Sequence, residues 1–365
     1  MLIGDRRWKN SLWMSKYNFK LIFSRMTVLV TGAGGFIAKH VINELLKEEY
    51  KVLGTVRCEI EGALLLRQFD NSNLGFEVVP EIADAKVVDE LFVKHGADID
   101  VIIHIACPLV HFSEDYETTM MTPAIEGTRN ILNSCSKYNV QRVVITSSAL
   151  AMVDFCTIYD DGLIFTEEAW NPVTRNNYGN IPTVAYAAAK KFAELEAWKF
   201  IKNNKVTFEL CTVCPTYVFG PRLFDEDLND FLNIANKPID DLIHSVPGQS
   251  LEPYLHSEYV DVRDVARAHI LAFQLDAAKG QRLAISAGKF NSQNIVDILN
   301  YTFPQLKGNI TQGPKPGTGG GEPGNIGARI GTIKTNEILG ISYRTLEETT
   351  YDLTKQILRV EGKLQ

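Results

Sequence analysis

The stretch "VLVTGAGGFIAKH", residues 28–40, decides the fold that the sequence predicts. It begins with an apolar run typical of a buried strand, and from Phe36 onward it has the amphipathic pattern of a helix. Gly32, Gly35 and Ala38 follow the spacing G-x-x-G-x-x-A. Glycine lacks the Cβ atom that would keep a pyrophosphate away from the backbone, and the helix N-terminus offers free N–H groups and the positive end of its dipole. The stretch therefore predicts dinucleotide binding, with a tight turn that binds nothing as the alternative.

After Met26 the chain alternates apolar runs with amphipathic runs, which is typical of a parallel sheet covered by helices on both faces. Strands are expected at 27–33, 51–57, 76–82, 100–108, 142–149 and 208–221, and helices at 36–50, 62–70, 86–96, 124–138 and 184–198. We predict an α/β fold in which residues 26–220 form a doubly wound parallel (Rossmann) sheet. Residues 221–365 are expected to form mainly a smaller C-terminal substrate-binding lobe, with some segments returning to the first domain. Helices are expected there from about Asp264 and over 345–362.

The composition is that of a globular protein with a small-molecule partner. Of the 365 residues, 45% are hydrophobic and 22% charged, and the formal net charge is -7. No basic patch dominates the sequence, which argues against nucleic acid or an anionic membrane as a partner.

The first 25 residues contain six Lys or Arg and a single acidic residue, Asp5. A targeting peptide is one interpretation, but serine and alanine enrichment is missing and the apolar run is too short to span a membrane. We therefore expect residues 1–25 to be an extension outside the fold, with Met26 as the natural start.

The six cysteines are scattered, as expected for reduced thiols in the cytoplasm. Cys211 and Cys214 form a C-x-x-C pair, but they lie in a strand-like run where positions i and i+3 point to opposite faces. The seven histidines lack the spacing of paired metal ligands. No metal site is predicted.

The residues after the second expected strand bear on the choice between NAD and NADP. A carboxylate about 20 residues after the glycines would hold the ribose 2′-OH of NAD. The sequence there is "TVRCEIE", in which Arg57 can pair with the 2′-phosphate of NADP through its planar fork. Glu59 and Glu61 would repel that phosphate if they turned toward it. The sequence favours NADP, and a solvated Arg57 is the alternative.

Tyr186 and Lys190 lie four residues apart in a predicted helix, which places them on one face. The preceding strand, "RVVITSSA", ends in Ser147 and Ser148. Ligands of open α/β sheets bind outside the carboxyl ends of the strands, so a serine hydroxyl and the tyrosine are expected at that edge. An ammonium near a phenol favours the phenolate and lowers the pKa of the tyrosine, and Lys190 is placed to do this.

The spacing Y-x-x-x-K has little specificity by itself, because Tyr351 and Lys355 repeat it. They lie in the last predicted helix, and no serine-bearing strand comes before them. We expect this second pair to be an ordinary helix face.

Together these motifs resemble the extended short-chain dehydrogenases/reductases, through "TGAGGFIA" (31–38), the strand-end serine, "YAAAK" (186–190) and "YVDVRDVARAH" (259–269). Within that family the chain looks like the yeast NADPH-dependent methylglyoxal and 3-methylbutanal reductases, which are relatives of plant dihydroflavonol reductases. This closer likeness is carried by "EVVPEI" (77–82), "TPAIEGT" (122–128), "TEEAWNP" (166–172), "KKFAELEAWKF" (190–200) and "YVFGPRLFD" (217–225). It extends from Met26 to the C-terminus.

The resemblance implies a Ser-Tyr-Lys mechanism, in which hydride passes from C4 of the reduced nicotinamide to a carbonyl carbon. Tyr186 would donate a proton to the oxygen, Ser148 would hydrogen-bond that oxygen, and Lys190 would hold the nicotinamide ribose. The expected cofactor-binding residues are Gly32, Gly35, Phe36, Ile37, Arg57, Glu81, Ile82, Tyr186, Lys190 and Val218. The resemblance places Pro108, Leu109, Val153 and Tyr217 in the substrate pocket, where core packing is the alternative for each.

Three positions depart from the family pattern. Ala124 stands where many members have an asparagine, so proton relay to solvent is expected to use water or the ribose. Glu61 stands where yeast relatives often have a lysine, which weakens the preference for NADP. Ala149 replaces an aromatic residue after the catalytic serine, which implies a roomier pocket that admits bulkier ketones.

The sequence thus predicts a cytoplasmic NADPH-dependent carbonyl reductase of aldehydes and ketones, acting as a monomer or homodimer. One alternative is an NAD-dependent nucleotide-sugar epimerase or dehydratase of the same fold. The other is a non-enzymatic NADP-binding sensor, which would need neither Tyr186 nor Lys190.

Overall fold

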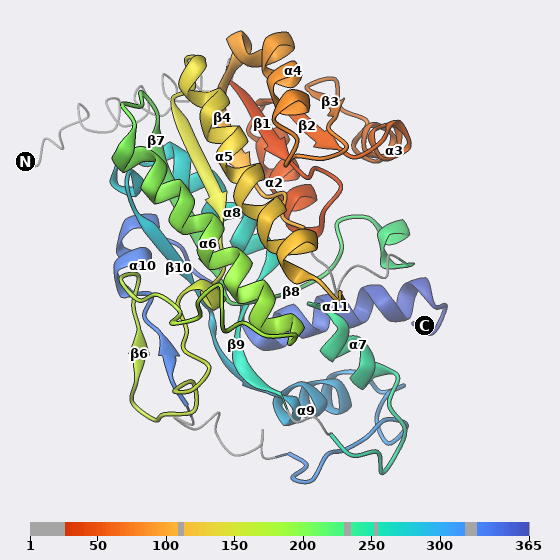
Figure 1. The fold of residues 1–365 in the computed structure, drawn as a ribbon. Helices are drawn as coiled ribbons and strands as arrows, with labels where there is room; N and C mark the ends of the chain where they lie inside the picture. The colour runs from red at the N-terminus through yellow and green to blue at the C-terminus, as the bar shows by residue number, and fades with distance from the viewer. Residues whose placement is uncertain (1–25, 109–112, 230–234, 252–254, 318–326, 365) are drawn as a thin grey trace, which may run out of the picture.

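A seven-stranded parallel sheet forms the centre of the molecule in the computed structural model, which describes residues 26–108, 113–229, 235–251, 255–317 and 327–364. Its strand order is β10-β7-β5-β4-β1-β2-β3. The strands are β1 (Thr27–Thr31), β2 (Lys51–Val56), β3 (Leu74–Val78), β4 (Ile99–His104), β5 (Arg142–Thr146), β7 (Glu209–Pro215) and β10 (Arg282–Ile285). The chain runs outward from β1 to β3 and then crosses to β4 on the other side of β1 (Figure 1). That reversal is the point where such sheets bind ligands.

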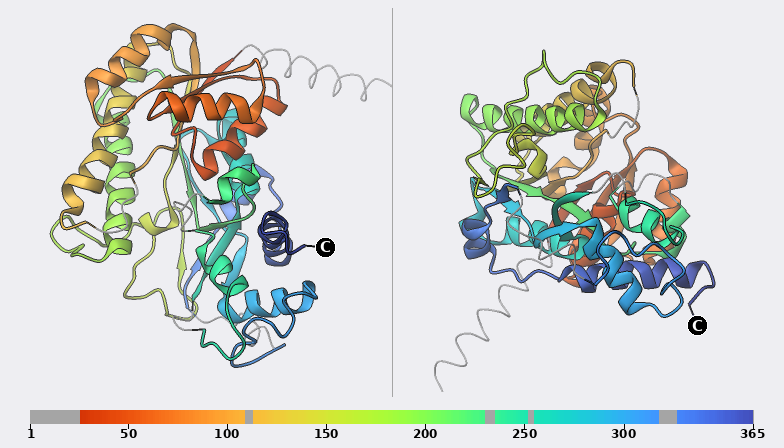
Figure 2. Two further views of the ribbon diagram at one scale, coloured as in Figure 1. Left: turned by 90° about the vertical axis from the view of Figure 1, so that its right-hand side faces the viewer. Right: turned by 90° about the horizontal axis from the view of Figure 1, so that it is seen from below.

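Helices cover both faces of this sheet, which confirms the predicted doubly wound fold (Figure 2). On one face, the core is shared with α2 (Phe36–Lys47), α3 (Glu59–Phe69) and α8 (Val262–Gln274). On the other, it is shared with α4 (Ala85–His95), α5 (Thr122–Lys137) and α6 (Pro182–Asn203). Buried apolar strand residues point alternately to the two cores.

The strands are continuous apolar runs because both of their faces are covered. Within the described ranges, no helix is both long enough and apolar enough to cross a bilayer.

A second, three-stranded sheet forms the base of a smaller lobe, with the strand order β11-β9-β8. Its strands are β8 (Tyr217–Phe219), β9 (His256–Asp261) and β11 (Gly288–Asn291). They pack on a core of their own with α7 (Lys237–Ile243), α9 (Ser292–Thr302) and α11 (Leu346–Val360). The short strands β6 (Ile164–Phe165) and β12 (Arg329–Ile330) pair nearby, and α10 (Ile333–Leu339) contacts β10.

Several elements begin or end a few residues away from their predicted bounds, and two of the differences change how the sheets are joined or how a helix is capped. The run 208–221, expected as one strand of the main sheet, divides into β7 and β8, and β8 joins the second sheet. At the division the backbone N–H of Thr216 donates to the carbonyl of Ile285 over 3.0 Å. The helix expected from about Asp264 begins at Val262, because the carboxylate of Asp261 accepts the N–H of Arg263 over 2.8 Å and caps the helix earlier.

Candidate active site

A cavity of about 1730 Å³ lies at the carboxyl edge of the main sheet, where the glycine turn, the strand ends and the strands of the second sheet meet. It brings together almost all the residues that the sequence singled out. The cavity is lined by Gly32, Gly35, Phe36, Ile37, Arg57, Glu81, Ile82, Pro108, Ser148, Val153, Tyr186, Lys190, Tyr217 and Val218. Leu109 lies outside the described residues, as does the extension 1–25.

The turn between β1 and α2 fits a dinucleotide pyrophosphate. Gly32 has a φ of +67°, which L side chains rarely adopt, and a Cβ added there would lie 3.1 Å from the Cα of Ala106. Gly34 faces open space, since a Cβ there would meet nothing within 4 Å. Gly35 is the N-cap residue of α2, and no side chain caps that helix end. Its first N–H groups and positive dipole end are therefore available to an anion.

One end of the cavity carries Arg57, which is exposed at the end of β2. Glu61, on the first turn of α3, accepts the backbone N–H of Arg57 over 2.9 Å. Ile82 and Glu81 form the facing wall, and Asn130 of α5 holds this loop by donating to the carbonyl of Ile82 over 3.2 Å. Arg57 and Glu61 thus lie beside each other at the end of β2.

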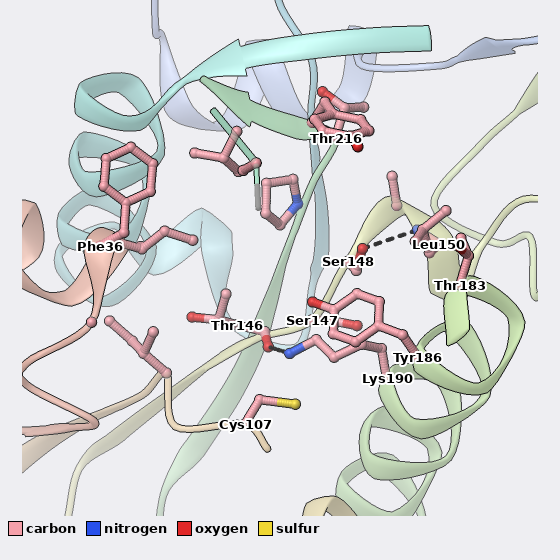
Figure 3. A pocket seen from close by; sticks show the side chains of 18 of the residues that line it. Phe36, Cys107, Thr146, Ser147, Ser148, Leu150, Thr183, Tyr186, Lys190 and Thr216 are labelled. Atoms are coloured by element: carbon pink, nitrogen blue, oxygen red, sulfur yellow. Dashed lines mark hydrogen bonds between the residues drawn. The ribbon is translucent and has the colours of Figure 1, made fainter. Parts of the chain in front are cut away.

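Tyr186 and Lys190 project from adjacent turns of α6 toward the strand-end serines (Figure 3). The ammonium of Lys190 is buried and donates to the backbone carbonyl of Thr146 over 2.6 Å. The Thr146 hydroxyl donates to Nε2 of His269 over 2.7 Å, because Nδ1 of that ring carries the hydrogen that it donates to the carbonyl of Val265. Burial lowers the pKa of His269 to about 4, so the ring is neutral at neutral pH.

Burial raises the pKa of Tyr186 above its ordinary value, and the charge of Lys190 offsets only part of this. From the sequence, Lys190 was expected to lower the pKa of Tyr186, because the nearby charge was taken into account but the burial was not. For Lys190, burial acts to lower the pKa, but the acidic groups of Cys107, Tyr186, Cys214 and Glu194 outweigh it and raise the pKa. At neutral pH the site therefore holds a protonated phenol beside an ammonium ion.

The two serines have different partners. Ser147 donates its hydroxyl to the buried carboxylate of Glu194 over 2.6 Å. Ser148 accepts the N–H of Leu150 over 3.1 Å, which leaves its own hydroxyl hydrogen for another acceptor. The hydroxyl hydrogen of Ser147 is thus taken up by Glu194, whereas that of Ser148 remains available in the cavity.

The second Y-x-x-x-K pair lies away from this cavity. Tyr351 stacks on Phe303 with ring centroids 5.3 Å apart, and the ammonium of Lys355 lies 5.5 Å from the Tyr351 ring centroid. Cys211 and Cys214 are buried free thiols that belong to different cores. In the part of the chain that the structure describes, no group of His, Cys, Asp and Glu is arranged to hold a metal ion.

Sequence reasoning missed three polar residues behind the site, namely His269, Glu194 and Arg282. One signal was present in the sequence. Glu194 follows Lys190 by four residues, so it continues the Tyr186 face of α6 into the protein. Its partner Arg282 could not be found in this way, because the two are 88 residues apart.

Comparisons with known proteins show the family of the chain. The sequence model of the 3-beta hydroxysteroid dehydrogenase/isomerase family matches residues 29–294. A putative uncharacterized oxidoreductase of Saccharomyces cerevisiae is 45% identical over 344 residues, which cover 93% of this chain and 99% of the relative. The NADPH-dependent methylglyoxal reductase of the same yeast is 43% identical over 345 residues, covering 93% and 100% of the two chains.

A solved structure adds a direct comparison of the fold. The crystal structure of yeast methylglyoxal/isovaleraldehyde reductase complexed with NADPH superposes with a TM-score of 0.89 at 42% identity. The match covers 93% of this chain and 100% of that one. The chain therefore belongs to the 3-beta hydroxysteroid dehydrogenase/isomerase family, within the extended short-chain dehydrogenases/reductases that its glycine turn and Tyr186/Lys190 pair predict.

Proposed function

We propose that this protein is an NADPH-dependent carbonyl reductase that converts aldehydes and ketones to alcohols. The observation that carries the proposal is the meeting of Ser148, Tyr186 and Lys190 with the glycine turn in one cavity. Relatives at 43% identity or more, covered over nearly their full length, include the yeast methylglyoxal reductase and support the same activity. Methylglyoxal and 3-methylbutanal are the proposed small substrates.

NADPH, when bound, supplies the hydride that reduces the carbonyl carbon. Tyr186 donates the proton that the carbonyl oxygen takes up, and its raised pKa keeps the phenol protonated at neutral pH. Ser148 donates a hydrogen bond to the same oxygen and so stabilises the negative charge that develops there. Lys190, anchored on the carbonyl of Thr146, keeps a positive charge beside Tyr186, and its remaining N–H groups would hold the nicotinamide ribose.

The cofactor's phosphates are assigned to two places in the cavity. The pyrophosphate would lie on Gly32, Gly35 and the N-terminus of α2, which no side chain caps. Arg57 would pair with the 2′-phosphate, although the Glu61 carboxylate, which accepts the backbone N–H of Arg57, lies nearby and opposes a second negative charge. The wall formed by Glu81 and Ile82 would contact the adenine.

Pro108, Val153 and Tyr217 are the proposed walls of the substrate pocket, with Val218 near the cofactor. Both Val153 and the buried Ala149 are small, so this side of the cavity leaves room for ketones larger than methylglyoxal. The six cysteines are all free thiols, which fits a reducing compartment, and we assign the protein to the cytoplasm as a monomer or homodimer.

Replacing Tyr186 with Phe tests the proposal. The change keeps the ring and removes only the proton donor, so we expect kcat for carbonyl reduction to fall about 100-fold or more, within the range of general acid catalysis. NADPH oxidation would be followed with methylglyoxal, 3-methylbutanal, diacetyl and an aryl ketone, with NADH run in parallel.

Tyr351→Phe is the matched control, since it makes the same change at the same spacing away from the cavity. It should leave turnover unchanged. Reduction by Tyr186→Phe at the wild-type rate would contradict the assignment, and enzyme that retains NAD through purification and epimerises nucleotide sugars would favour the rival function.

A further inference from the structure

A buried ion pair lies directly behind the proposed reactive serine. Its carboxylate belongs to Glu194, whose side chain has no exposed surface, and its cation is Arg282 of β10, with 9% exposed. One oxygen of Glu194 accepts Nε of Arg282 over 2.7 Å and the Thr212 hydroxyl over 2.7 Å. The other accepts the Ser147 hydroxyl over 2.6 Å. This carboxylate is therefore saturated with donors, as a buried charge must be.

The pair joins the end of β5, helix α6 and strand β7, three segments at the reactive edge. Ser147 is the neighbour of Ser148 at the end of β5, while Glu194 lies one turn beyond Lys190 on the helix that carries Tyr186. Thr212 belongs to β7, which lies between β5 and β10 in the main sheet.

Arg282 also holds the segment 167–171 against this edge. Its Nη1 donates to the carbonyls of Glu167 over 2.6 Å and Ala169 over 2.7 Å. Its guanidinium carbon lies 3.7 Å from the ring centroid of Trp170. Asn171 then donates to the carbonyl of Leu150 over 2.9 Å, in the turn that follows Ser148.

We propose that Glu194 is a positioning residue for carbonyl reduction: its carboxylate fixes the serine-bearing end of β5 relative to the helix that carries Tyr186 and Lys190. This inference rests on the proposed function. A buried ion pair is weak evidence for stability, because its desolvation cost offsets much of the attraction. Its geometric effect is larger, since a displacement of about 1 Å at reacting groups can cost about 100-fold in rate.

Glu194→Gln tests this, because it keeps the shape and the acceptor oxygen but removes the charge. We expect kcat to fall about 10- to 100-fold, while the Kd for NADPH, measured by its fluorescence, changes by less than about 2-fold. With NADPH deuterated at the transferred position, the kinetic isotope effect on kcat should rise, since misplaced groups slow the hydride step. A purely structural role would not change the isotope effect.

Asp261→Asn is the matched control. Asp261 is also fully buried, accepts Nη2 of Arg263 over 2.7 Å and a threonine hydroxyl over 2.9 Å, and lies outside the lining of the cavity. We expect it to lower the melting temperature as much as Glu194→Gln does, with kcat and the isotope effect as in the wild type. Equal losses of kcat in the two variants would overturn the proposal.

Ser147→Ala provides a second test that retains the ion pair, and it decides the matter should Glu194→Gln not fold. It removes the hydrogen bond between Glu194 and the end of β5, so kcat should fall about 5-fold, in line with about 1 kcal/mol for one hydrogen bond. The isotope effect should rise as it does in Glu194→Gln. An unchanged kcat and isotope effect would overturn the proposal. Failure of the proposed function would instead appear as normal turnover in Tyr186→Phe.

Discussion

Protonation of His269 should destabilise the protein as the pH falls below about 6.5. The ring is fully buried on α8 and serves as a donor to Val265 and an acceptor from Thr146. Only the neutral ring can do both, because the imidazolium has no acceptor. Burial accordingly lowers the pKa from 6.5 to about 4.

The sign and size of the effect follow from proton linkage. Between about pH 4 and 6.5 the unfolded state binds a proton at this residue and the folded state does not, so acid favours unfolding. The loss is ~1.36 kcal/mol for each pH unit below the unfolded pKa, or roughly 2 kcal/mol at pH 5. The loss at pH 5 lowers the folding equilibrium constant by a factor of about 30.

His269→Asn should remove this part of the pH dependence. The free energy of unfolding would be measured by urea denaturation at about pH 8 and pH 5 for both proteins. We expect the acid-induced loss to be roughly 2 kcal/mol smaller in the variant, whatever the variant's stability at pH 8. His40 and His104, whose pKa values burial lowers to about 4 and about 3, leave a residual loss in both proteins. Equal losses in the two proteins would refute the reasoning.

Two further changes test the cofactor assignment and the packing. Arg57→Ala should raise the Kd for NADPH about 10-fold or more, within the 1.5–3 kcal/mol typical of a hydrogen bond to a charged group. The Kd for NADH should stay unchanged. If fluorescence titrations showed equal effects on the two cofactors, the pairing of Arg57 with the 2′-phosphate would be contradicted. Gly62→Ala should destabilise the protein by about 1–3 kcal/mol, because the new Cβ would lie 2.2 Å from the ring of Phe76; an unchanged unfolding midpoint in urea would show that the ring moves aside without cost.

Much of the main sheet could be predicted because its signals are local. The three-residue spacing of the glycine turn is contained in a short stretch after β1. Each of the other strands is likewise a short continuous apolar run. Local patterns also separate the two Y-x-x-x-K pairs, since Tyr186 follows a serine-bearing strand and Tyr351 does not.

The remainder depends on contacts between distant residues. Pro215 ends β7 within the run 208–221, but nothing in that run indicates that β8 joins another sheet, because its partner there is β9. Likewise, its spacing from Lys190 places Glu194 on the inward face of α6, but no local pattern identifies its partner Arg282, which is 88 residues away. The raised pKa of Tyr186 also requires the tertiary structure, because burial is its main cause.

After β9 the chain returns to the main sheet through α8 and β10, so the enzyme cannot be cut into two independent fragments near residue 220. A fragment ending at Gly220 would leave β7 as a bare edge, because β10 is its outer partner. It would also lack the buried side chains of α8, such as Val265 and Phe273, that fill one core beside β1. Exposed strand edges and apolar faces favour aggregation. Transplanting a lobe from a relative is therefore expected to succeed only as an exchange of surface loops, with β10 and α8 left in their native sequence.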